Sequence, residues 1–244
     1  MHFHLPKPLH GWREFAGEVA IIVLGVMIAL GAEQVVEQWH WRGEVREADQ
    51  RMRDDMRFDL AVASERFAID PCLRPRLGEL RDQLIKTDAI WPGSRARFAN
   101  DLYKSGFPSA YRTPNRPWKQ ASWLTVLNGE VLGHFKPERV QQFALLFNEV
   151  ESLDQSQAQE VDTAASLGDL AFAGPISPAE RRANLKVVAK LDALDARIVF
   201  SAKVLLADAR EAGLTPDLQA VREEIEQQRT YRGSCVQEPL LKAL

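Results

Sequence analysis

Residues 11–41 read GWREFAGEVAIIVLGVMIALGAEQVVEQWHW and contain the most apolar segment of the chain. The centre of this segment, residues 19–32, is 14 residues long and uncharged, with Glu18 and Glu33 at its ends. A helix needs about 20 predominantly apolar residues to cross the hydrocarbon core of a bilayer. Further apolar and small residues lie on both sides of the centre, so residues 15–38 predict one transmembrane helix.

Two patterns within this segment suit a helix in lipid. Tryptophans flank it on both sides, as interfacial anchors do, and these are Trp12, Trp39 and Trp41. Small side chains recur at i, i+4 and i+7 on one helix face, where they allow close approach of a second helix; these are Gly25, Ala29 and Ala32. This face predicts association with another inner-membrane protein, or self-association.

Two other interpretations of the segment stay open from the sequence. The 14-residue centre alone would fit a buried helix or the core of a signal peptide. However, the preceding residues include Glu14 and Glu18 against only Lys7 and Arg13, which makes a poor positively charged region for a signal peptide. Because the helical pattern also continues beyond the apolar block, we expect an uncleaved anchor.

Over the whole chain the composition is that of an ordinary globular protein. It has 244 residues, 45% of them hydrophobic, with 31 Lys+Arg against 34 Asp+Glu and a net charge of −3. These values exclude intrinsic disorder, collagen and a disulfide-dense mini-protein. A mean hydropathy of −0.26 excludes several membrane spans. The net charge argues against nucleic acid as a partner, so the expected partners are the lipid bilayer and other proteins.

Helical periodicity runs through most of the remaining chain and predicts an all-α fold. The transmembrane helix is expected to continue as a long stalk to a break at Asp70-Pro71-Cys72, and a short helix follows over residues 73–84. Further helices are expected over residues 117–127 and 137–170, from a capping box at Ser177 and Glu180 to residue 213, and over residues 215–233. No strand pattern stands out, and we expect an up-and-down helical bundle.

One irregular region interrupts the helical pattern at residues 87–117, with at most a short helix over 95–103. Cations and aromatic residues alternate in and just after it, and form a candidate binding patch: Arg95, Arg97, Arg112, Arg116, Trp118 and Lys119. Arginine beside aromatic rings can bind anions, lipid headgroups or an acidic partner surface. The alternative is internal compensation, because residues 138–169 contain seven acids and one cation, Arg139.

The chain has two cysteines, Cys72 and Cys235, and each follows a long helical pattern in a break that contains proline or glycine. This placement suits a single disulfide formed in an oxidising compartment, and two unrelated free thiols are the alternative.

Patterns that carry chemistry are sparse. The sequence contains no phosphate-binding loop, GxSxG motif, HExxH motif or kinase motif set. The five histidines have no metal-site spacing with the cysteines; they are His2, His4, His10, His40 and His134. We therefore expect no catalytic residues, metal or cofactor.

Two stretches resemble an uncharacterised bacterial family of single-span inner-membrane proteins. The first comprises Trp12-Arg13-Glu14, residues 23–30 and residues 34–46. The second is the central block RPWKQASWLTVLNGEVLGHFKPERVQQFALLFNEV, residues 116–150, with Trp118, Trp123 and Phe143. The resemblance implies a bacterial inner-membrane protein with one span, and carries no known activity, cofactor or catalytic residue.

These observations predict a tail over residues 1–14, a transmembrane helix over 15–38 and a helical extramembrane domain over 39–244. Three cations follow the span, and these are Arg42, Arg46 and Arg51. By the positive-inside rule they favour a cytoplasmic domain, but this rule is weaker for long domains that are translocated. The cysteines favour a periplasmic domain and a cytoplasmic N-terminus. We expect a non-enzymatic accessory or scaffold subunit of a larger inner-membrane assembly; the alternatives are a ligand-sensing domain or an envelope-acting enzyme.

Overall fold

The computed structural model describes residues 11–96 and 108–238, and this part of the chain is almost entirely helical, which confirms the all-α prediction. Five α-helices are described: α1 (Gly11–Lys86), α2 (Ala121–Leu127), α3 (Pro137–Ala165), α4 (Pro178–Glu211) and α5 (Leu218–Arg232). Two 3-10 helices, η2 (Glu130–His134) and η3 (Gly168–Ala171), precede α3 and follow it. Strands β1 (Ile90–Pro92) and β2 (Ala173–Pro175) pair antiparallel, with Ile90 opposite Pro175.

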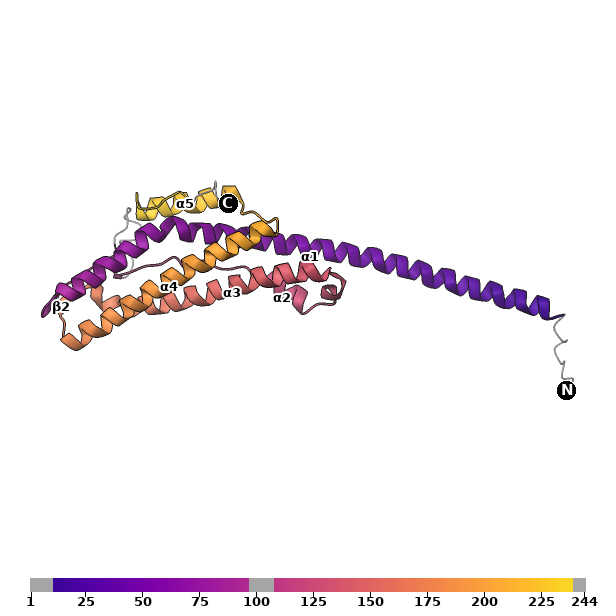
Figure 1. The fold of residues 1–244 in the computed structure, drawn as a ribbon, viewed down its shortest axis with the longest axis horizontal. Coiled ribbons are helices and arrows are strands. Elements are labelled where there is room, and N and C mark those ends of the chain that lie inside the picture. Colours follow the sequence, from indigo (N-terminus) through magenta and orange to yellow (C-terminus); the bar gives the residue numbers. More distant parts are fainter. Residues whose placement is uncertain (1–10, 97–107, 239–244) are drawn as a thin grey trace.

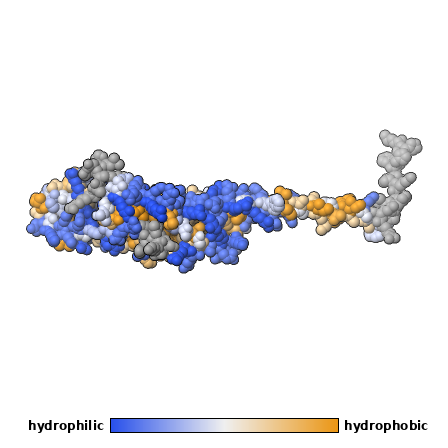
Figure 2. All heavy atoms as spheres, turned by 90° about the horizontal axis from the view of Figure 1, so that it is seen from above, coloured by the Kyte–Doolittle hydropathy of each residue, from blue (hydrophilic) through white to orange (hydrophobic). Residues whose placement is uncertain are grey.

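Helix α1 is 76 residues long, and its N-terminal part projects away from the other helices (Figure 1). An 18-residue window in this part has a mean hydropathy of 2.3 and no buried residue. Figure 2 shows the projecting part as largely hydrophobic, whereas the visible face of the bundle is mainly hydrophilic. By length and composition, α1 is therefore long and apolar enough to cross a membrane.

The long helix predicted beyond the apolar segment is present, and its second half is the first helix of the bundle. Ala48, Met52, Met56 and Leu60 recur at spacings of four and are buried in a core shared with α2, α3 and α4. Residues at this spacing form an apolar stripe on one face of a helix, and such a stripe is stable in water when other apolar side chains pack against it. Helices α3 and α4 supply that cover, and α1 joins the projecting segment to the bundle without a break.

The predicted break at residues 70–72 is wrong, because α1 continues through Pro71 and Pro75 to Lys86. A proline inside a helix removes one hydrogen bond and bends the helix, and Figure 1 shows α1 changing direction beneath α5. Near this bend the Ala68 carbonyl accepts a hydrogen bond from Gln237 N at 2.9 Å. The C-terminal segment thus supports the helix where the prolines weaken it.

The bundle departs from simple up-and-down order at its first connection. Residues 110–122 run back along α1 in the opposite direction: Arg76 of α1 donates to the Ala110 carbonyl, and farther along Lys119 N donates to Asp59. This return places α3 parallel to α1, after which α4 and α5 each reverse direction (Figure 1). An extended segment, and not a helix, therefore fills one position of the bundle.

Helix α4 begins and ends close to where the sequence predicts. The Ser177 hydroxyl accepts from Glu180 N at 3.2 Å, and the Glu180 carboxylate accepts from Ser177 N at 2.7 Å, so the predicted capping box is confirmed. Gly213 follows the helix with φ +71°, a conformation that favours glycine. Helix α3 ends earlier than predicted: the chain turns into η3, whose Leu170 carbonyl accepts from Trp91 Nε1 at 2.7 Å.

Candidate functional site

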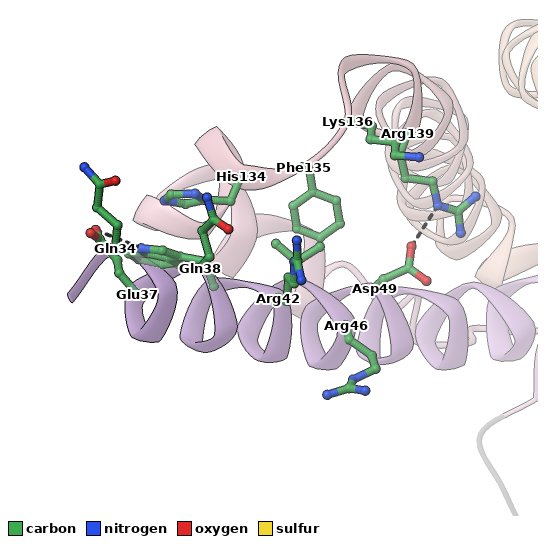
Figure 3. Close-up of a pocket in the computed structure, with 12 residues that line it drawn as sticks. Gln34, Glu37, Gln38, Arg42, Arg46, Asp49, His134, Phe135, Lys136 and Arg139 are labelled. Atoms are coloured by element: carbon green, nitrogen blue, oxygen red, sulfur yellow. Dashed lines mark hydrogen bonds and ion pairs between the residues drawn. The ribbon is translucent and has the colours of Figure 1, made fainter. Parts of the chain in front are cut away.

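A groove of about 660 Å³ lies where the projecting part of α1 meets the bundle. One wall is α1 between Gln34 and Asp49, and the other is the turn from His134 to Arg139 that joins η2 to α3 (Figure 3). Pro137 occupies the first turn of α3 after this connection, where its fixed φ suits the start of a helix and its missing N–H costs no hydrogen bond. We call this feature the junction groove.

An aromatic pair forms one end of the junction groove. The rings of Trp41 and His134 stack with their centroids 4.0 Å apart and an interplanar angle of 12°. Trp41 Nε1 donates to the Glu37 carboxylate one turn earlier in α1, at 3.4 Å. Phe135 is buried next to this pair and points toward α1 in Figure 3. These contacts hold η2 against α1.

An ion pair closes the other end of the groove. Arg139 donates to Asp49 at 2.8 Å, and Arg53 donates to the same carboxylate at 2.5 Å. Burial alone would raise the pKa of Asp49, but the hydrogen bonds from both arginines outweigh it and hold the pKa below its ordinary value. The Arg139 guanidinium also lies 4.2 Å from the Phe143 ring centroid, so this arginine is fixed in place.

Three more cations line the groove and are exposed: Arg42, Arg46 and Lys136. No hydrogen bond or ion pair joins their side chains to another of the described residues. In Figure 3 Arg42 points up between α1 and Phe135, whereas Arg46 lies at the rim and points away from Phe135. Four cations therefore line the groove against two carboxylates, Glu37 and Asp49, and the arrangement suits an anion.

The residues of the sequence-predicted basic and aromatic patch do not form one surface. Lys119 Nζ lies 4.1 Å from the Phe58 ring centroid, Trp118 packs against the core, and Arg95 donates to the Ala171 carbonyl near the strand pair. The Arg112 carbonyl accepts from Arg232, and Arg97 lies outside the described residues.

Arg116 is the patch residue with the most extensive ionic contacts. Its guanidinium donates to Glu65 of α1 at 2.9 Å and also to Glu224 of α5. The charge of Arg116 is thus compensated inside the fold, but its acidic partners come from α1 and α5 and not from residues 138–169, where the sequence placed them. Residues 138–169 contribute a different contact, in which the Gln157 side chain donates to the Arg116 carbonyl at 2.7 Å.

A buried ionic cluster, which the sequence pattern did not reveal, lies under residues 111–113. Arg66 donates to Glu160 at 2.5 Å, to Asp195 at 2.7 Å and to the Thr113 hydroxyl at 2.6 Å. The Thr113 hydroxyl in turn donates to Glu160 at 2.6 Å. Burial raises the pKa of Asp195 to about 7, although the charge of Arg66 opposes that rise. The cluster joins α1, α3 and α4, and we assign it to the core.

The remaining predicted residues lie on or next to the projecting segment. Trp12 and Trp39 are exposed, and Trp41 is the stacked residue of the junction groove. Ala29 and Ala32 are exposed, and a Cβ added at Gly25 would have no atom within 4 Å. The small-residue face of the projecting segment therefore has no packing partner among the described residues.

Cys72 and Cys235 form a disulfide with their Cα atoms 5.2 Å apart, which confirms the predicted pairing against the alternative of two free thiols. The bridge ties the bend of α1 to the segment after α5.

Within the described ranges, no group of three His, Cys, Asp or Glu side chains could hold a metal ion. Three of the histidines, His2, His4 and His10, lie outside those ranges. His134 contributes to the junction groove; the sequence indicated only a residue in a turn, because nothing local places it beside Trp41.

Comparisons with protein-family models, curated proteins and solved structures find no match to this chain, so its function is argued from its own residues.

Proposed function

We propose that the chain is a membrane-anchored accessory or scaffold subunit, without an enzymatic role, that holds a helical domain at the surface of the bacterial inner membrane for a larger membrane-protein assembly. One observation carries the proposal. The N-terminal part of α1 is apolar and has no contact with the bundle, while the second half of the same helix packs in the core of the bundle. A continuous helix transmits position and orientation, which a flexible linker would not.

The disulfide supports a periplasmic position for the bundle, with the short N-terminal tail in the cytoplasm. Disulfides persist in oxidising compartments and are rare in the cytosol. The Cys72–Cys235 bridge joins segments 163 residues apart in the chain, so it closes the chain between the bend of α1 and the end of α5 into one loop.

The anchor is tested by extracting membranes with alkaline carbonate. The variant Leu24→Arg/Ile28→Arg places two charges in the apolar segment, at a cost of about 6 kcal/mol if that segment spans the bilayer. The control Leu145→Arg/Phe200→Arg makes the same change on α3 and α4, at residues of closely similar exposure, 63% and 67% against 58% and 64%. We expect wild type and control to stay in the pellet and the first variant to leave it; extraction of the wild type would contradict the anchor.

The accessory role is tested separately, by purifying the full chain in mild detergent and identifying bound proteins by mass spectrometry. A membrane protein recovered in constant stoichiometry supports the role. A clean monomer, obtained while the carbonate experiment succeeds, contradicts the accessory role and leaves the anchor standing.

A further inference from the structure

The junction groove begins where the apolar part of α1 ends. Val36 is the last apolar residue before Glu37, and a helix rises about 1.5 Å per residue. If Val36 marks the edge of the hydrocarbon core, Trp41 lies about 8 Å and Arg46 about 15 Å beyond that edge. The headgroup layer on each side of a bilayer is roughly 5–8 Å thick, so the Trp41 end of the groove lies at the outer edge of the headgroups and the Arg46 end extends into water.

The end of the bundle beside the groove has features of a surface that meets lipid. Helix α2 and η2 form the end of the bundle nearest the projecting segment (Figure 1). Leu124 and Leu127 of α2 are 51% and 43% exposed there, and Trp39 is 72% exposed on α1. Exposed leucine and tryptophan side chains beside cations are typical of surfaces that lie in the membrane interface.

The charges of the groove match those of anionic lipid. Asp49 is already bound by Arg139 and Arg53, and Glu37 accepts from Trp41, so both carboxylates that line the groove have partners. Arg42 lines the groove from α1 and Lys136 lines it from the start of α3, and neither has an ion-pair partner among the described residues (Figure 3). Arg139 Nη2 is buried and has no hydrogen-bond partner there. Cationic pockets beside membrane helices bind the phosphates of anionic lipids.

We propose that the junction groove binds the headgroup phosphate of an anionic phospholipid from the adjacent leaflet. Arg42 and Lys136 contact the phosphate oxygens, and the stacked Trp41 and His134 rings pack against the glycerol backbone. This site rests on the membrane anchoring proposed above. Its role is to fix the height and rotation of the bundle on the membrane, because one bound lipid ties α1 to the η2–α3 turn.

The test uses the full chain in mild detergent and counts bound lipids by native mass spectrometry. The probes are dioctanoyl phosphatidylglycerol, which is anionic, and dioctanoyl phosphatidylcholine, which is zwitterionic. The variant Arg42→Gln/Lys136→Gln removes the two cations proposed to contact the phosphate. The control Lys190→Gln/Arg197→Gln removes one lysine and one arginine from the exposed face of α4. Circular dichroism establishes that both variants are folded.

We expect wild type and control to bind phosphatidylglycerol in preference to phosphatidylcholine, and the groove variant to bind phosphatidylglycerol on the order of 30-fold more weakly. Equal binding of the two lipids by wild type, or equal losses in the groove variant and the control, would overturn the proposal. A competition arm separates the sources of phosphate: displacement of the lipid by an equal concentration of inorganic phosphate would assign the groove to a soluble anion and overturn the lipid assignment. Because binding is measured in detergent, a failure here is distinct from a failure of the carbonate experiment.

Discussion

Asp59 is a fully buried carboxyl in the bundle half of α1, and it has one hydrogen bond. Its Oδ1 accepts from Lys119 N at 2.8 Å, while Oδ2 has no hydrogen-bond partner among the described residues. Burial raises the pKa of Asp59 to about 8, the charges of Asp55 and Asp154 add to the rise, and the Lys119 N–H only partly opposes it. The folded chain therefore favours the protonated acid.

This raised pKa sets the sign and size of a pH effect. A carboxyl whose pKa is higher in the folded state contributes most stability below its unfolded pKa, 3.8, and loses that contribution as the pH rises through the folded value, about 8. Each pKa unit corresponds to about 1.36 kcal/mol. Between pH 5 and pH 9 the contribution of Asp59 to the free energy of unfolding therefore falls by about 4 kcal/mol.

The variant Asp59→Asn keeps the Oδ1 acceptor for Lys119 N and is neutral throughout this range. We expect its free energy of unfolding to exceed that of wild type by about 4 kcal/mol more at pH 9 than at pH 5. The measurement is urea unfolding of the full chain in mild detergent, followed by circular dichroism at pH 5, 7 and 9. Asp54→Asn is the matched control, because Asp54 is an exposed aspartate on the same helix, and its profile should parallel wild type.

Asp195, with its pKa of about 7, adds a slope of the same sign that Asp59→Asn leaves in place. The comparison therefore depends on the difference between variant and wild type at each pH. If that difference stays constant from pH 5 to pH 9, Asp59 is ionised in the folded protein and the reasoning from its burial is refuted.

Three further predictions concern the stability of the bundle. The variant Cys72→Ser/Cys235→Ser should lower the free energy of unfolding by about 5 kcal/mol in the chain-entropy treatment, measured by urea unfolding; reaction of both wild-type cysteines with a thiol reagent before reduction would contradict the bridge. Arg116→Ala should lower the free energy of unfolding by about 3 kcal/mol, because it leaves the buried Glu65 without its cation. Adding Glu65→Gln to the same chain should recover part of that loss. If the double variant recovers nothing, the ion pair is contradicted. Gly93→Ala should lower the melting temperature by several degrees. Gly93 has φ +79°, and a Cβ there would lie 2.9 Å from the backbone nitrogen of Ala173 in the paired strand. An unchanged melting temperature would contradict that close approach.

Features that depend on neighbouring residues in the chain were predictable from the sequence. The apolar block over residues 19–32, the apolar stripes of the bundle helices and the capping box at Ser177 each follow a short, regular spacing. The disulfide was predicted from expected breaks around Cys72 and Cys235, although α1 continues through the first of them and the bridge itself is a long-range contact. The physical reason is that helix periodicity and helix caps involve contacts within about four residues.

Features that depend on distant residues were not predictable in the same way. Pro71 predicts a break, yet the helix persists because the disulfide and the Gln237 contact hold the chain at the bend. The cations near Arg116 were recognised, but their partners could have been any of several acidic segments. Charge counts along a sequence do not specify which side chains meet.

The amino-acid sequence of this protein determines an all-α chain with one long apolar segment near its N-terminus, because hydrophobic periodicity is a local property. The tertiary structure decides that this segment and the core helix of the bundle are one helix, and that the return of residues 110–122 places α3 parallel to α1. It also stacks Trp41 on His134 and places Arg42 and Lys136 in the same junction groove. These residues lie more than ninety positions apart, and only packing of the whole bundle brings them together.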